Sequence, residues 1–123
     1  MELIGTWINE YGSQMEITEI KDNTFKGKYS STTGTTGSYN VIGCFNPFIQ
    51  NGTIVVSLSI SWNNLDSNGP QSQWDYSVSS MTGLLQKIGD RQLLIVTHVL
   101  VQSTIVSNNW QSSIIDKLTF VKQ

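Results

Sequence analysis

The stretch Gly5-Thr6-Trp7-Ile8-Asn9-Glu10-Tyr11-Gly12-Ser13 combines a strand, a tight turn and the start of a second strand. Side chains alternate along a strand, so Trp7 and Asn9 are expected on one face. Gly12 permits a tight turn, and Ser13 then opens the next strand on the same inward face. A large indole beside two small hydrogen-bonding groups is typical of a pocket that holds a compact polar ligand.

The rest of the chain repeats this arrangement of short strands and turns. About eight alternating runs follow one another, and no segment has the period of a sustained amphipathic helix. They cover residues 3–9, 13–20, 24–31, 38–45, 53–62, 73–86, 92–103 and 113–121. Because a closed barrel leaves no exposed sheet edge, we predict an all-β fold, an eight-stranded antiparallel up-and-down β-barrel. It is expected to be one domain over residues 1–123.

Composition and charge exclude several partners. Seven Lys and Arg against nine Asp and Glu form no basic stripe, so nucleic acid is not expected as a partner. The longest apolar run, residues 93–101, contains Thr97 and His98 and is too short to span a bilayer, so no membrane partner is expected. No signal-peptide pattern begins the chain, which leaves the compartment open. Cys44, the single cysteine, has no partner for an internal disulfide.

The run at residues 92–103 is apolar on both faces. One face carries Leu93, Ile95, Thr97, Val99 and Val101, and the other carries Leu94, Val96, His98 and Leu100. In a small closed barrel one of these faces must point outward, where an apolar patch favours association. We place His98 on the outer face, and Ile115 and Val121 extend this outer surface. The pattern therefore predicts that another subunit buries it.

With its opening Gly5-Thr6-Trp7, followed by Asn9 and Ser13, the chain resembles the avidin and streptavidin family. The resemblance covers nearly the whole chain and implies a biotin-binding barrel. It implies that Asn9, Ser13 and Tyr29 donate to the ureido oxygen of biotin, as an amide and two hydroxyls can.

The remaining pocket positions also follow from the resemblance. Ser31 matches a serine that accepts from a ureido nitrogen, and Thr35 lies in a loop that closes over the ligand. Ser77 and Ser79 match hydroxyl positions near the thioether and the carboxylate. Other matching positions are Trp62, an aromatic wall of the pocket, and Trp110, which a neighbouring subunit inserts across the pocket mouth.

Several residues depart from the family pattern. Leu118 stands where the family has an Asp or Asn that accepts from the second ureido nitrogen, and a buried donor without a partner costs about 1–3 kcal/mol. Val99 and Met81 stand where the family has large aromatic wall residues. Asp116 occupies an inward position where the family has glycine. Its carboxylate either collides with biotin or accepts hydrogen bonds from the hydroxyls of another ligand. Alternatively, Asp116 is a strand residue displaced so that its side chain reaches water. These changes predict weaker biotin binding than in typical avidins.

The resemblance further implies an oligomer, expected as a homotetramer and at least as a homodimer. The residues expected at the subunit interface are Val96, His98, Leu100, Trp110, Ile115 and Lys117. Secretion is also implied by the family alone.

Two functions remain open. The first is a non-enzymatic protein that binds biotin or a biotin-like ligand inside the barrel, supported by Asn9, Ser13, Tyr29 and Ser31. The second is an avidin-like lectin for carbohydrate or glycoprotein, in which biotin recognition is lost. An enzyme is not expected, because the single histidine is placed outward and neither a His-Asp-nucleophile cluster nor metal-ligand spacing is apparent. No cofactor is expected, and biotin is a ligand only.

Overall fold

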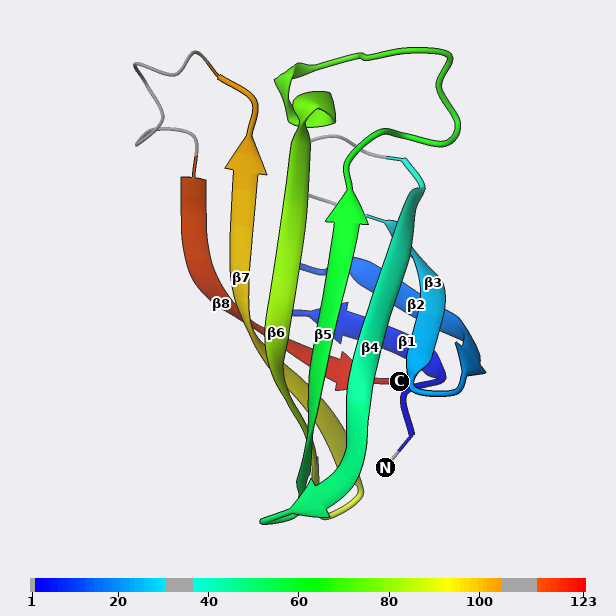
Figure 1. Ribbon diagram of the computed structural model, residues 1–123, viewed down its shortest axis with the longest axis vertical. Coiled ribbons are helices and arrows are strands. Elements are labelled where there is room, and N and C mark those ends of the chain that lie inside the picture. Colours follow the sequence, from blue (N-terminus) through cyan, green and yellow to red (C-terminus); the bar gives the residue numbers. More distant parts are fainter. Residues whose placement is uncertain (1, 31–36, 105–112) are drawn as a thin grey trace.

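The computed structural model describes residues 2–30, 37–104 and 113–123. Within these ranges the backbone forms eight strands, each paired antiparallel with the next, and β8 returns to pair with β1 (Figure 1). The strands are β1 (Gly5–Asn9), β2 (Gln14–Lys21), β3 (Thr24–Ser30), β4 (Tyr39–Gln50), β5 (Thr53–Ser61), β6 (Ser77–Ile88), β7 (Arg91–Gln102) and β8 (Ser113–Lys122). The predicted closed, eight-stranded antiparallel barrel is confirmed.

Alternation along the strands builds the core. In β5 the side chains of Ile54, Val56, Leu58 and Ile60 are buried, and Val55, Ser57, Ser59 and Ser61 between them are more exposed. Strand β3 follows the same rule, with Phe25 and Tyr29 inside and lysines outside. Because every strand contributes one inward row, the interior is lined by side chains from all eight.

In β7 the row of side chains that faces the interior is not the predicted row but the other one. Leu94, Val96 and Leu100 are buried, and Val96 pairs with Leu118 of β8, whose side chain is also buried. Val99 belongs to the outer row. The prediction of Val96 and Leu100 as interface residues, and of Val99 as a pocket wall, is therefore wrong. Both faces of this strand are apolar, so alternation alone does not fix which one is inside.

The segment before β6 differs from the predicted strand. Gln73–Tyr76 form a 3-10 helix, η1, instead of the first residues of an extended run. Ser72 caps it, because its hydroxyl accepts from the backbone N–H of Trp74 at 3.2 Å. The side chain of Ser77 then donates to the carbonyl of Trp74 at 2.5 Å, which fixes the entry into β6.

Apolar side chains remain on the outside of the barrel over β6, β7 and β8. Ile115 is 70% exposed, and Val78, Leu84 and Val101 are also exposed. An outer apolar surface was predicted and is present. The row of β7 that contributes to it is the one predicted to face the interior. The described part of the chain contains no helix long and apolar enough to cross a membrane.

Candidate functional site

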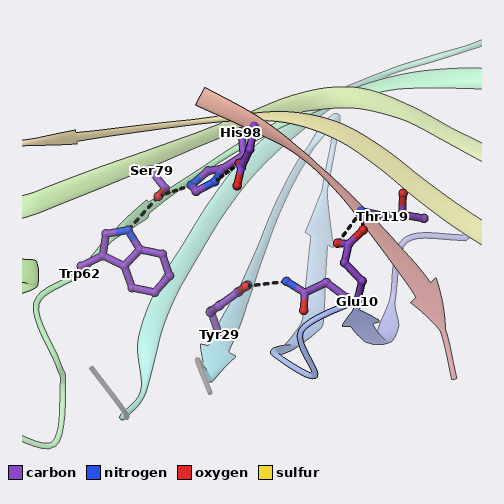
Figure 2. A network of polar contacts seen from close by, with 8 residues as sticks. Glu10, Tyr29, Trp62, Ser79, His98 and Thr119 are labelled. Atoms are coloured by element: carbon purple, nitrogen blue, oxygen red, sulfur yellow. Dashed lines mark hydrogen bonds and ion pairs between the residues drawn. The ribbon is translucent and has the colours of Figure 1, made fainter. Parts of the chain in front are cut away.

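The turn after β1 fixes the orientation of the Asn9 side chain. Its Oδ1 accepts the backbone N–H groups of Tyr11 and Ser13, each at 3.0 Å, while Gly12 adopts the positive φ that the turn requires. Since Oδ1 is held by the turn, the amide nitrogen is the end left to point across the barrel. It donates to the Tyr29 hydroxyl at 3.3 Å (Figure 2).

Asn9, Ser13 and Tyr29 lie together, as predicted, and all three are buried. Burial raises the pKa of Tyr29, and hydrogen bonds from Ser13 and Asn9 oppose this rise with smaller effects. The phenol therefore keeps its proton at neutral pH and can donate it. We call these three residues the cradle, because an amide N–H and two hydroxyls meet at one place.

A second contact ties the cradle turn to the opposite end of the chain. The carboxylate of Glu10 accepts the backbone N–H of Thr119 at 3.0 Å, which links the turn to β8 directly after Leu118 (Figure 2). No motif or alternation pattern singles out Glu10. It holds the turn, and with it Asn9, against the strand that carries the other inward residues.

Aromatic rings stand beside the cradle. The ring of Trp62 meets that of Tyr29 edge to face at 5.3 Å between centroids, and that of Tyr39 at 4.9 Å. Phe120 lies edge-on to Tyr29 at 6.3 Å. Trp62 thus packs against the cradle through the ring of Tyr29.

The indole of Trp62 also begins a chain of polar contacts. Its Nε1–H donates to the Ser79 hydroxyl at 2.8 Å, Ser79 Oγ lies 2.7 Å from His98 Nε2, and His98 Nδ1 lies 2.8 Å from Asp116 Oδ1 (Figure 2). We call Trp62, Ser79, His98 and Asp116 the relay. It runs from the partly buried wall to a carboxylate that is 44% exposed.

The position of His98 corrects a prediction. His98 was expected on the outer face as an interface residue, but its side chain is only 12% exposed and contacts Ser79, which belongs to the inward row of β6. An inward histidine is tolerated because both ring nitrogens have polar partners. Two features of the sequence pointed to it, since Ser79 and Asp116 were predicted inward and β7 lies between β6 and β8.

The other predicted site residues divide into three groups. Ser77, Met81 and Leu118 are buried in inward rows, as expected. Ile115 and Lys117 lie on the outer row of β8, where an interface was predicted. Ser31, Thr35 and Trp110 lie outside the described residues.

A serine, a histidine and an aspartate joined by successive polar contacts form the arrangement of a hydrolase triad. The expectation that no such cluster exists was therefore wrong. Ser79, however, is 0% exposed, with its hydroxyl held between the indole and the imidazole. A nucleophile needs an open side from which a carbonyl carbon can approach. The relay therefore holds the wall in place rather than presenting a nucleophile. Among the described residues, no group of three or more His, Cys, Asp or Glu could hold a metal ion.

Comparison with known proteins agrees with this architecture. The family model described as the Avidin family matches residues 1–123, which is the whole chain. No curated protein gives a significant sequence match. A complete match over an eight-stranded antiparallel closed barrel shows that the chain belongs to the avidin family.

Proposed function

We propose that this protein is a non-enzymatic binder that takes biotin, or a biotin-like ligand, into the interior of the barrel. The cradle is the observation that carries the proposal. Three donor groups, one from β1, one from the turn before β2 and one from β3, meet at one place, and backbone amides hold the Asn9 oxygen away from the site. Such a set suits a ligand carbonyl oxygen that carries partial negative charge.

The proposed affinity is lower than that of typical avidins. Leu118 is buried in the inward row but has no acceptor for a second ligand N–H. Titration calorimetry with biotin tests the proposal. Saturable binding supports it, and the absence of heat with tens of micromolar protein would contradict it.

Removing one cradle donor should weaken this binding. Tyr29→Phe deletes a hydroxyl and is expected to reduce biotin affinity about 2- to 12-fold, because a net hydrogen bond contributes about 0.5–1.5 kcal/mol. The dissociation constant is measured by calorimetry. Tyr76→Phe makes the same chemical change at an exposed position before β6 and should leave the affinity unchanged. Equal effects of the two variants would argue against the cradle.

A lectin remains a second candidate function, favoured by Asp116. This carboxylate faces inward on β8 and is partly exposed, and carboxylates accept hydrogen bonds from sugar hydroxyls. Haemagglutination that glycoproteins inhibit, and that biotin leaves unchanged, would favour the lectin over the biotin binder.

We also propose that the barrel assembles as a homotetramer, or at least as a homodimer, through the outer apolar row of β7 and β8. Ile115→Glu places a charge on this row and is expected to lower the molar mass measured by light scattering. Lys26→Glu introduces the same side chain on the outer face of β3, away from the row, and should leave the mass unchanged. A wild-type protein that already has the mass of one chain would contradict the assembly.

A further inference from the structure

The chemistry of the relay fixes where most of its protons lie. The indole Nε1 of Trp62 can only donate, so Ser79 Oγ accepts from it. An ionised carboxylate can only accept, so the proton on His98 Nδ1 points at Asp116. The one contact that can run in either direction is the 2.7 Å pair of Ser79 Oγ and His98 Nε2.

When His98 is neutral, its single ring proton is on Nδ1, and Nε2 is an acceptor. The Ser79 hydroxyl then donates to Nε2, and every donor in the relay points the same way, from Trp62 toward Asp116. In this state the Ser79 hydroxyl donates its hydrogen bond to the imidazole and has none left for a ligand. The His98–Asp116 pair carries one negative charge.

Protonation of His98 reverses this contact. Nε2 becomes a donor, so Ser79 Oγ receives two N–H groups and its own O–H is released from the relay. Ser79 is fully buried, so the released O–H has no water beside it and favours any arrangement that supplies an acceptor. The negative charge of the His98–Asp116 pair is neutralised in the same step.

We propose that His98 determines which ligands the interior site prefers: protonated His98 favours ligands that bring an anionic or acceptor group to the Ser79 side of the site. The inference rests on the proposed function, because it concerns ligands of that same interior. Since Trp62 and His98 cover Ser79, such a ligand reaches the hydroxyl when the Trp62 indole moves aside and the imidazolium keeps its contact with Ser79. Ligand binding and protonation then favour each other, so affinity rises as pH falls through the titration range of histidine.

Few titratable groups surround the imidazole. Its neighbours across the two strand pairs are Met81 of β6 and Asp116 of β8, and Ser79 is its hydrogen-bond partner on β6. Lys117 points to the opposite face of β8. Burial raises the pKa of Tyr29, which lies on the far side of Trp62, so this phenol does not titrate between pH 5 and 8. His98 is the single histidine of the chain, and histidine is the side-chain type whose reference pKa lies between pH 5 and 8.

The first test needs no ligand. The ¹H–¹⁵N resonance of the Trp62 indole, identified by its loss in Trp62→Phe, should shift with pH between about 5 and 8, because its acceptor Ser79 changes partner. His98→Gln should abolish the shift, and Asp116→Asn should move its midpoint to lower pH. An indole resonance that stays constant over this range in the wild type would overturn the proposal.

The second test compares two probes by calorimetry, biotin as a carboxylate and biotinamide as its neutral counterpart, at about pH 5.5 and about pH 8. Biotin affinity should rise about 10-fold at the lower pH, with uptake of a proton on binding, which is an ordinary size for coupling between two binding events. Biotinamide affinity should rise less. His98→Gln should bind biotin equally at both values. A biotin affinity that does not depend on pH would overturn the preference. No heat at either pH would contradict the proposed function. The indole resonance then separates the two: if it shifts with pH, only the proposed function has failed, and if it stays constant, the inference has failed as well.

Discussion

Replacing Trp7 with alanine is expected to lower the free energy of unfolding by about 3–5 kcal/mol. The indole is 0% exposed and packs in the core formed by the inward rows. Its Nε1–H donates to the carbonyl of Leu3 at 2.9 Å, so the substitution also leaves a buried acceptor without its partner. Urea denaturation followed by far-ultraviolet circular dichroism measures the change without depending on tryptophan fluorescence.

A matched control separates burial from residue type. Trp74 lies in η1 and is partly exposed, and Trp74→Ala removes the same side chain at a cost expected below about 1 kcal/mol. Trp7→Phe retains most of the volume and should lose less than Trp7→Ala. If Trp7→Ala and Trp74→Ala destabilise equally, Trp7 does not have the structural role assigned to it.

The barrel could be predicted because most of its strands carry one apolar and one polar row. In β3 and β5 the alternation states which face is inside, and strand count and closure follow. The cradle could be predicted because Asn9 and Ser13 flank a turn, Tyr29 lies on a strand with clear alternation, and the family resemblance is specific at these positions.

The relay could not be predicted from the same pattern. Both rows of β7 are apolar, so the assignment of its inner face rested on a choice that alternation does not make. An assignment that is wrong by one residue exchanges the inner and outer positions of every side chain on the strand. The predicted positions of His98 and Val99 were therefore wrong together. The physical cue was the inward charge of Asp116, since a carboxylate on an inner row needs a donor, and His98 was the neighbour on β7 able to supply one.

Asn9→Asp is expected to weaken biotin binding about 100-fold and to leave the fold intact. The aspartate still accepts the backbone N–H groups of Tyr11 and Ser13, so the turn after β1 is retained. Its second oxygen replaces the amide donor and accepts a hydrogen bond from the Tyr29 hydroxyl, which removes two donors from the cradle and places an anion beside the ligand carbonyl. Two lost hydrogen bonds and this repulsion together cost about 3 kcal/mol in binding.

Asn9→Ala distinguishes the two roles of the side chain. Alanine removes the acceptor as well as the donor, so the backbone N–H of buried Ser13 loses its partner, and unfolding free energy is expected to fall by about 1–3 kcal/mol. Calorimetry with biotin and urea denaturation on both variants should therefore give weak binding twice and a stability loss for alanine only. Because Asn9→Asp retains the turn and changes only what faces the ligand, wild-type affinity in that variant would show that no carbonyl oxygen binds between Asn9 and Tyr29.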